Sequence, residues 1–91
     1  MLEIKYTAQA RRDLKKLASQ NKDLSKLAFV LNLLAAGKTL PAKNRDHALR
    51  GGHTGHRECH VEPDWLLIYT VNNLALVLTA IRTGSHSELF G

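Results

Sequence analysis

The chain has 91 residues, of which 44% are hydrophobic and 23% are charged. This length and composition predict one globular domain, residues 1–91, with a single core. The single cysteine excludes an internal disulfide, and no apolar run reaches the ~18 residues that a membrane span needs. The N-terminal residues lack the apolar stretch of a signal peptide, so we expect a soluble cytoplasmic protein with no membrane partner.

The positive charge is concentrated in the first part of the chain. The formal net charge is +5. Residues 1–50 hold eleven Lys and Arg against four Asp and Glu, a net of +7, whereas residues 51–91 hold two against four, a net of −2. Basic surface attracts polyanions such as nucleic acid. A solvated helix surface has the same composition, so charge alone leaves both interpretations open.

The N-terminal part of the chain predicts one strand and two helices. Apolar and charged residues alternate over residues 2–6, as in a strand. Thr7 can cap a helix whose apolar positions run from Ala10 to Ala18. A second apolar stripe runs from Leu24 to Ala35, and Gly37 suits the position just after its end. Two helices joined by a short turn favour an antiparallel helical hairpin.

The remaining part predicts strands. Residues 38–55 are expected to be irregular, because they are rich in glycine and charge. From His56 to Val61 the period becomes two, and the almost entirely apolar segment from Trp65 to Val71 predicts a central strand. Asn72-Asn73 predicts a two-residue hairpin turn, because asparagine tolerates positive φ, and residues 74–81 predict the return strand.

The last residues predict a short helix. Thr83-Gly84 ends the return strand, and Ser85 to Glu88 matches a capping box for a helical turn. The main order of elements is therefore β-α-α-β-β-β. Helices and strands grouped in this way predict an α+β fold, with the helical hairpin packed on one face of an antiparallel sheet.

The stretch Gly51–Trp65 contains the side chains that best suit a metal ion. They are His53, His56, Cys59 and His60. There is no Cys-x-x-Cys pair, and His56 and His60 do not lie on a predicted helix. Cys59 and His60 point to opposite faces of a strand. The spacing therefore predicts no metal and no cofactor, and we expect Cys59 to be structural.

Histidines near neutral pH also suit metal-free proton transfer. Cleavage of RNA by its own 2′-OH needs a base, an acid for the leaving 5′ oxygen, and positive charge at the phosphate. The residues of the right types are His47, His60, Asp64, Arg82 and His86. They belong to the loop, the strand corner and the C-terminal end, and three antiparallel strands would bring these parts to one edge of the sheet.

Each candidate also has a structural interpretation. A histidine on a strand or in a loop can be satisfied by its neighbours, and Asp64 suits a turn. Arg82 could pair with Glu88 or Glu62. Phe90 could pin the chain end to the core. The residues alone leave these alternatives open.

Three segments form a recognisable set. They are Asp46–Leu49 (DHAL), Arg57–Tyr69 (RECHVEPDWLLIY) and Arg82–Phe90 (RTGSHSELF). Together they resemble the YafQ-type branch of the RelE/ParE toxin superfamily, and the similarity covers nearly the whole chain. The resemblance implies a RelE-like fold and a toxin of a bacterial type II toxin–antitoxin pair. Such toxins enter the ribosomal A site and cleave the mRNA there without a metal, leaving a 2′,3′-cyclic phosphate and a 5′-OH.

The resemblance also implies roles for single residues. The positions that match the family's catalytic set are His47, His60, Asp64 and His86. We expect His86 to be the general acid, with one of the other two histidines and Asp64 on the base side. Phe90 matches an aromatic residue that helps to hold the substrate base, and Arg82 occupies a position suited to stabilising the phosphate.

The partners implied by the resemblance are a cognate antitoxin, the ribosome and mRNA. The basic helices, including Lys15 and Lys16, are expected to contact RNA backbone. The antitoxin, encoded beside the toxin, would wrap it and cover part of the same surface, and operator DNA would be bound only by the complex.

Two other functions stay open. One is a toxin of the same fold without nuclease activity, acting on another target such as gyrase. The complete set of three histidines and Asp64 argues against it, because the gyrase-directed branch lacks that set. The other is a stand-alone metal-binding or DNA-binding module.

Overall fold

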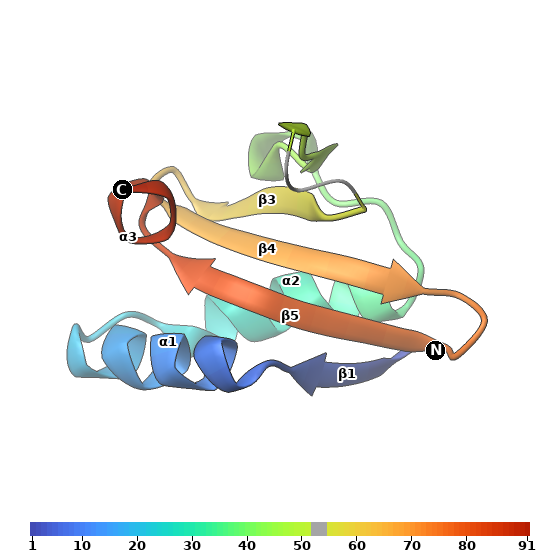
Figure 1. Cartoon of the computed structure of the whole chain (residues 1–91), viewed down its shortest axis with the longest axis horizontal. Coiled ribbons are helices and arrows are strands. Elements are labelled where there is room, and N and C mark those ends of the chain that lie inside the picture. Colours follow the sequence, from blue (N-terminus) through green and yellow to red (C-terminus); the bar gives the residue numbers. More distant parts are fainter. Residues whose placement is uncertain (52–54) are drawn as a thin grey trace.

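The computed structural model describes residues 1–51 and 55–91. Its elements are β1 (Glu3–Tyr6), α1 (Ala8–Ser19), α2 (Leu24–Ala35), the 3-10 helix η1 (Ala42–Asn44), β2 (His47–Ala48), β3 (Arg57–Glu62), β4 (Trp65–Asn72), β5 (Val77–Gly84) and α3 (His86–Phe90) (Figure 1). The five strands form one sheet in the order β1-β5-β4-β3-β2, and α1 and α2 pack against one of its faces. The predicted α+β fold is confirmed. No helix in the described part of the chain is long and apolar enough to cross a membrane.

The direction of β1 differs from the prediction of a fully antiparallel sheet. β1 pairs in parallel with β5, with Ile4 opposite Leu78, whereas the other neighbouring strands are antiparallel. Two helices separate β1 from the rest of the sheet along the chain, so no hairpin fixes its direction. The sheet is therefore antiparallel except at this edge.

The turn between β4 and β5 is wider than predicted. Asn72 still belongs to β4, opposite Val77, so the turn comprises residues 73–76 rather than Asn72-Asn73. The side-chain oxygen of Asn72 accepts two hydrogen bonds of 3.0 Å from backbone N–H groups of the turn. Asparagine thus stabilises this turn through its side chain, and the return strand runs from Val77 to Gly84.

A short strand lies in the segment that was expected to be irregular. β2 pairs with β3 and places His47 opposite Glu58. The carboxylate of Asp46, just before it, accepts hydrogen bonds from the Tyr69 hydroxyl at 2.7 Å and from Nε of Arg57 at 3.3 Å. Burial and the hydrogen bond to Asp46 raise the pKa of Tyr69, so its hydroxyl stays a donor. Contacts with β3 and β4, not local sequence, hold β2 in place.

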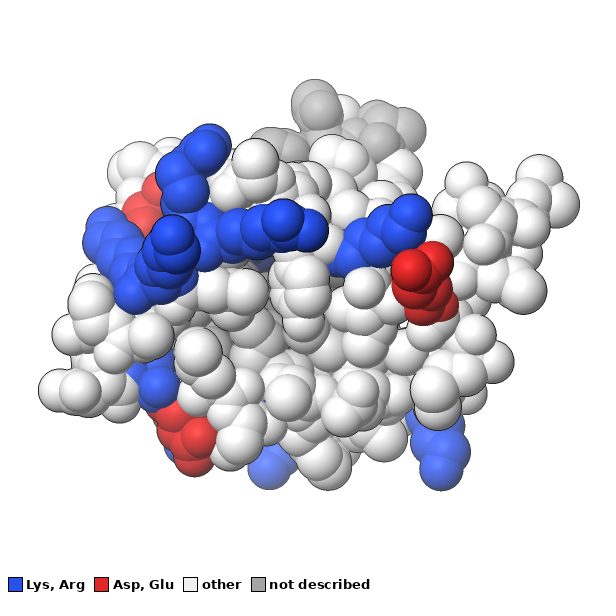
Figure 2. Space-filling view, turned by 90° about the horizontal axis from the view of Figure 1, so that it is seen from below, with Lys and Arg blue, Asp and Glu red and all other residues white. Residues whose placement is uncertain are grey.

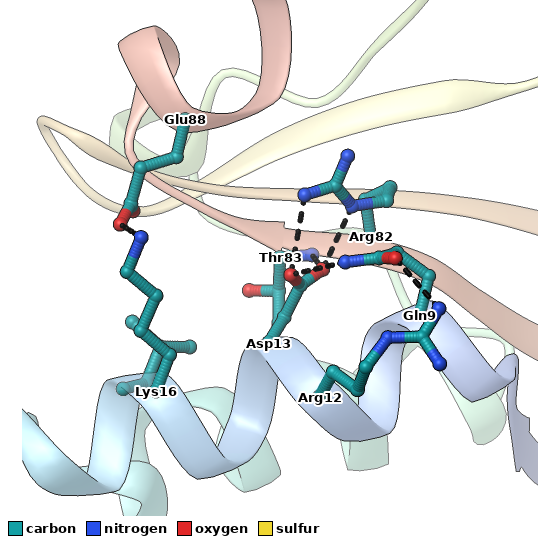
Figure 3. Close-up of a pocket in the computed structure, with 8 residues that line it drawn as sticks. Gln9, Arg12, Asp13, Lys16, Arg82, Thr83 and Glu88 are labelled. Atoms are coloured by element: carbon teal, nitrogen blue, oxygen red, sulfur yellow. Dashed lines mark hydrogen bonds and ion pairs between the residues drawn. The ribbon is translucent and has the colours of Figure 1, made fainter.

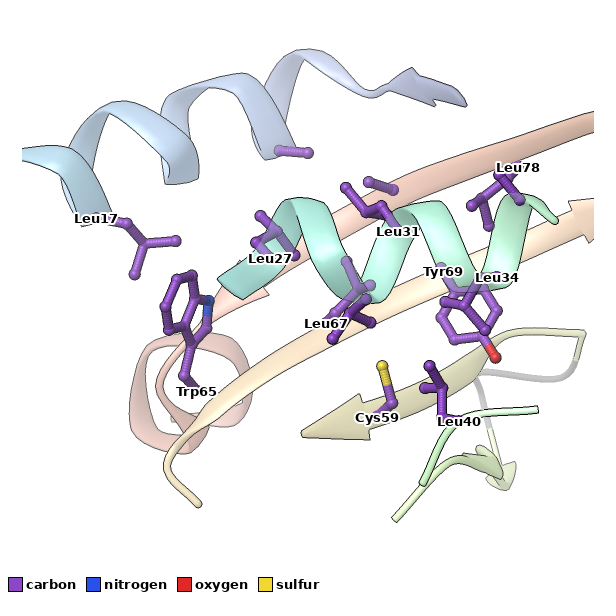
Figure 4. Packing of buried hydrophobic residues seen from close by; sticks show 14 residues of the cluster. Leu17, Leu27, Leu31, Leu34, Leu40, Cys59, Trp65, Leu67, Tyr69 and Leu78 are labelled. Atoms are coloured by element: carbon purple, nitrogen blue, oxygen red, sulfur yellow. The ribbon is translucent and has the colours of Figure 1, made fainter. Parts of the chain in front are cut away.

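The core lies between the sheet and the two long helices (Figure 4). Leu17, Leu27 and Leu31 of the helices are at most 3% exposed, and Trp65 and Leu67 of β4 are at most 1% exposed. A fully buried side chain of this size contributes roughly 1.5–3 kcal/mol. This packing fixes β4, and with it the register of the strands on either side.

Cys59 faces the same core and is fully buried. Burial raises the pKa of its thiol to about 12, so the thiol is protonated and neutral near pH 7. The structural interpretation of Cys59 is confirmed. Glu58 and His60, which alternate with it along β3, lie outside the core cluster, as the predicted strand requires.

Candidate active site

A buried carboxylate lies between two of the predicted catalytic histidines. Glu58 on β3 is 8% exposed. Its Oε1 lies 3.4 Å from Nε2 of His47 and 3.9 Å from Nε2 of His60. His47 is its cross-strand partner and His60 follows two residues later on the same face, so register and alternation together explain the contact. We name His47, Glu58 and His60 the Glu58 cluster.

The second ring nitrogen of each histidine fixes how the imidazole is oriented. Nδ1 of His47 lies 2.6 Å from the backbone carbonyl oxygen of Arg45, and Nδ1 of His60 lies 3.0 Å from that of Pro63. A carbonyl oxygen only accepts hydrogen bonds, so each Nδ1 carries a proton and donates it. The other nitrogen of each ring, Nε2, faces Glu58.

Local structure supports both rings. Arg45 follows η1 in the left-handed region, with φ 50°, and this turn brings its carbonyl oxygen to His47. Asn44 is 5% exposed, and its Nδ2 donates to the backbone oxygen of His60 at 2.7 Å. The β3–β4 register shifts between His60 and Glu62. Such bulges re-aim side chains and are frequent beside functional sites.

Asp64 and His86 form a second pair. Asp64 lies in the β3–β4 turn, and its Oδ1 accepts a hydrogen bond of 3.0 Å from the backbone N–H of His86. His86 begins α3, so this carboxylate satisfies a helix N-terminal N–H where negative charge is favourable. The exposed imidazole of His86 lies with its ring centroid 5.1 Å from that of Phe90. Phe90 is 38% exposed, so it is not buried in the core.

The β3–β4 turn connects the two pairs. It provides the carbonyl of Pro63, which holds His60, and the carboxylate of Asp64, which holds His86. Figure 1 shows α3 beside this turn. Open grooves of about 300 and 350 Å³ border it, one lined in part by His60 and Pro63 and the other in part by Asp64 and Ser85. The four predicted catalytic residues therefore lie on β2, on β3, in the β3–β4 turn and at the start of α3, and no hydrogen bond between described atoms joins the two pairs directly.

Arg82 is bound by a residue of α1. Its Nε and Nη2 donate to the carboxylate of Asp13 at 2.9 and 3.2 Å (Figure 3). The same carboxylate accepts the backbone N–H of Thr83 at 3.1 Å. The ion pair of Arg82 is therefore with Asp13, not with Glu88 or Glu62.

The ion pair changes the protonation of Asp13 and the availability of Arg82. Burial alone would raise the pKa of Asp13, but hydrogen bonds, above all from Arg82, bring it below the ordinary 3.8. Two of the five guanidinium donors of Arg82 are used on the carboxylate. Contact of the other donors with phosphate stays a prediction.

The two lysines predicted to bind RNA differ in their surroundings. Lys15 and Lys16 are both exposed on α1. Nζ of Lys16 lies 2.6 Å from Oε2 of Glu88, so its charge is partly engaged within the protein (Figure 3). Their contact with RNA stays a prediction, as does the contact of Phe90 with a base.

The other described metal-ligand candidates, His56 and Cys59, do not join the Glu58 cluster. His53 lies outside the described residues. His56 is half-buried ahead of β3, where its backbone oxygen accepts the N–H of Leu49 at 3.0 Å. Cys59 faces the opposite side of the sheet. Within residues 1–51 and 55–91, no group of three or more His, Cys, Asp or Glu side chains has the geometry to hold a metal ion.

The sequence prediction omits Glu58 from the site. The signal was present, because Glu58 and His60 alternate on one face of a predicted strand. What the sequence does not give is the two-residue strand β2, and only that strand places His47 on the far side of the carboxylate.

Comparison with known proteins identifies relatives of the whole chain. Residues 2–91 match the family described as the bacterial toxin of type II toxin–antitoxin system, YafQ. The mRNA interferase toxin YafQ of Escherichia coli strain K12 is 41% identical over 90 residues, which cover 98% of this chain and 96% of that protein. A chain of the E. coli DinJ–YafQ complex superposes with a TM-score of 0.90 at 39% identity, covering 100% of both chains. A metal-bound toxin from Helicobacter pylori superposes with a TM-score of 0.94 at 42% identity, covering 99% of this chain and 100% of that one.

The fold and the sequence thus define one class of protein, the toxins of type II toxin–antitoxin systems. Within that class the chain belongs to the YafQ family. The resemblance predicted from the three sequence segments is confirmed.

Proposed function

We propose that this toxin is an endoribonuclease that cleaves mRNA on the ribosome by metal-free acid–base chemistry. The endoribonuclease class agrees with the name mRNA interferase of its E. coli relatives. The observation that carries the proposal is the Glu58 cluster, in which two imidazoles present their Nε2 atoms to one carboxylate. Such a cluster suits proton transfer near neutral pH.

In the proposed reaction the RNA supplies its own nucleophile. Nε2 of His47 or His60 takes the proton of the 2′-OH, and the 2′ oxygen bonds to the adjacent phosphorus. The bond from phosphorus to the 5′ oxygen breaks, and protonated His86 gives its proton to that leaving oxygen. The products are a 2′,3′-cyclic phosphate and a 5′-OH, and no water is consumed. Glu58 stabilises the imidazolium that forms beside it.

Positive charge near the phosphate is the third requirement. Arg82 keeps guanidinium donors that Asp13 does not use, and we assign them to the phosphate. Preorganised cations act on the charge that develops in the transition state. We assign Phe90, whose ring contacts that of His86, to stacking on a substrate base beside the proposed acid.

The basic surface supports binding to ribosomal RNA. Figure 2 shows a row of Lys and Arg side chains on the side where α1 and β1 lie. The exposed cations that β1 and α1 contribute are Lys5, Arg11, Arg12, Lys15 and Lys16. The only acidic residue of α1, Asp13, is buried against Arg82 and subtracts little from this surface. Contacts of lysine and arginine with phosphate position a protein on RNA without reading its sequence.

The same surface suits a cognate antitoxin. In E. coli, YafQ is found in a complex with DinJ. By family membership we propose an equivalent partner here, with acidic residues that cover part of the α1 surface, and operator DNA bound only by the complex. Cytoplasmic location follows from these partners.

Metal dependence is tested separately, because the solved relatives include a metal-bound H. pylori toxin and a copper-bound variant. The proposed reaction needs only protein side chains. We expect toxin that has been treated with EDTA and then freed of the chelator to cleave ribosome-bound mRNA, in buffer with Mg²⁺ for the ribosome, as fast as untreated toxin. Loss of activity in the EDTA-treated toxin, restored by zinc or copper, would contradict the metal-free mechanism.

The proposal is tested by inducing the toxin in bacteria and mapping mRNA 5′ ends during growth arrest. We expect cuts within translated regions for the wild type and none for His86→Ala. His56→Gln is the matched control, because it changes a histidine without a proposed role. An equally toxic His86→Ala protein that produces the same cuts would contradict the catalytic assignment.

Two further outcomes separate the alternatives. Arrest without mRNA cuts, together with DNA damage, would favour a toxin of this fold that acts on gyrase. Purified toxin that cleaves free RNA as fast as ribosome-bound RNA would contradict dependence on the ribosome.

A further inference from the structure

We infer that Glu88 is a positioning residue: bound by Lys16 of α1, it fixes α3 and thereby sets where His86 lies relative to Asp64. The inference rests on the proposed function, in which His86 is the general acid. It assigns a part in the reaction to two residues that need not touch the substrate.

The helix α3 cannot hold its own position. It has five residues and none of them is buried. Isolated helices shorter than ~12 residues are marginal in water, because few hydrogen bonds offset the cost of nucleation. The orientation of α3, and of His86 at its first position, therefore depends on contacts with the rest of the protein.

Glu88 makes contacts in two directions. Its Oε1 accepts the backbone N–H of Ser85 at 2.9 Å, and Ser85 Oγ accepts the backbone N–H of Glu88 at 3.2 Å, which completes a capping box. Its Oε2 lies 2.6 Å from Nζ of Lys16 (Figure 3). One oxygen thus closes the first turn of α3, and the other ties that turn to α1.

Gly84 leaves room for this carboxylate. A Cβ at Gly84 would lie 3.0 Å from Oε1 of Glu88, closer than side-chain carbons ordinarily approach an oxygen. The glycine has φ +156°, a conformation that other residues rarely adopt. The chain therefore accommodates the Glu88 carboxylate at the junction of β5 and α3.

Charge favours the same arrangement. The hydrogen bond from Lys16, followed by those from Ser85, lowers the pKa of Glu88 to about 2, so the carboxylate is ionised at neutral pH. A negative charge in the first turn also interacts favourably with the helix dipole. The side chain of Lys16 is 59% exposed and that of Glu88 is 24% exposed, so salt weakens the ion pair more than it weakens the capping box.

Two carboxylates therefore restrain the N-terminal turn of α3. Asp64 binds the backbone N–H of His86, and Glu88 binds Ser85 and Lys16. Without Glu88 the link to α1 is lost and the turn pivots about Asp64. A misplacement of ~1 Å in a reacting group can cost up to about 100-fold in rate.

The experiment compares Glu88→Ala, Glu88→Gln and Lys16→Met with the wild type. It measures hydrogen exchange of the His86 amide, and the cleavage rate in single turnover as the ribosome concentration is varied. Glutamine keeps an acceptor for the capping box but loses the charge that binds Lys16. Lys15→Met is the matched control for exchange, because it removes the same charge from α1 without touching α3.

We expect Glu88→Ala to lose protection of the His86 amide and to lower the saturated cleavage rate about tenfold, with little change in the half-saturating ribosome concentration. Glu88→Gln should lie between Glu88→Ala and the wild type. Lys16→Met keeps the capping box and should lose part of the protection of the His86 amide, as Glu88→Gln does, whereas Lys15→Met should keep it.

Wild-type protection and rate in Glu88→Ala, alongside an inactive His86→Ala, would overturn this inference and leave the proposed function intact. A wild-type protein that does not cleave ribosome-bound mRNA would overturn both. A change confined to the half-saturating concentration would assign Glu88 to binding and also overturn the inference.

Discussion

Asp13 holds Arg82 by two hydrogen bonds, of 2.9 and 3.2 Å, although the residues are 69 positions apart in the chain. The same carboxylate binds the backbone N–H of Thr83, where β5 extends beyond its pairing with β1. A strand edge without a partner strand exposes N–H groups that need acceptors. Asp13 therefore joins α1 to the free part of this edge and restrains Arg82 beside the candidate site.

We expect Asp13→Asn to lower the free energy of unfolding by about 2 kcal/mol, because it loses charge-assisted hydrogen bonds at a buried position. Urea denaturation followed by circular dichroism measures the change. Asp23→Asn is the matched control, since asparagine caps a helix as well as aspartate does and the expected change is below about 0.5 kcal/mol. Equal unfolding free energies of Asp13→Asn and wild type would show that the hydrogen bonds of Asp13 to Arg82 and Thr83 contribute nothing to stability.

The contribution of Asp13 should depend on pH. Burial raises its pKa, but the hydrogen bonds from Arg82, Thr83 and Gln9 together bring the pKa in the folded protein below the ordinary 3.8. A carboxyl group whose pKa is lower in the folded than in the unfolded state stabilises the folded protein at pH values above its unfolded-state pKa. This stabilisation is lost as the pH falls through the folded-state pKa. The difference in unfolding free energy between wild type and Asp13→Asn should therefore be full at pH 7 and should shrink below about pH 3.8. A difference that stays constant down to pH 2 would contradict this assignment.

Replacing Glu58 tests the proton-transfer cluster. Glu58→Gln keeps the shape of the side chain but removes the charge that stabilises an imidazolium at His47 or His60. We expect the saturated cleavage rate to fall by roughly 10- to 100-fold, within the range for loss of acid–base assistance. Single-turnover cleavage on ribosomes measures it, with Glu3→Gln, an exposed glutamate on β1, as the control. An unchanged rate would make Glu58 a structural residue.

The thiol of Cys59 should be unreactive in the native protein. It is fully buried, and burial raises its pKa to about 12, so almost no thiolate is present at pH 8. A colorimetric disulfide reagent at pH 8 should modify it only after denaturant is added. Rapid modification of the native protein would mean that β3 opens locally and exposes the core.

The features that the sequence predicts are those determined by local patterns. Thr7 accepts the N–H of Ala10 and caps α1, and Ser85 with Glu88 forms the predicted capping box. The alternation of side chains along β3 correctly predicts that Cys59 and Glu58 lie on opposite faces of the sheet. Each of these depends on residues a few positions apart, where spacing alone decides which side chains meet.

The features that the sequence does not predict depend on how segments distant in the chain pair with one another. β2 has two residues and pairs with β3, and Asp46, just before it, accepts the hydroxyl of Tyr69 on β4. The contact of Glu58 with His47 needs that pairing, and the contact of Arg82 with Asp13 needs the position of α1 beside β5. No periodicity within one element carries this information, so candidate residues could be named but their partners could not.

The parallel pairing of β1 with β5 has a consequence for how the toxin is made. The hydroxyl of Thr7, just after β1, donates to the backbone oxygen of Ile81, 74 positions later. During synthesis the contacts of β1 and of the start of α1 with β5 therefore cannot form until β5 has been made. Contacts between residues so far apart in the chain also form slowly. Arg82, Ser85 and His86 emerge with or after that same strand. In a nascent chain the candidate site therefore stays incomplete until β5 and the residues that follow it have left the ribosome that makes them.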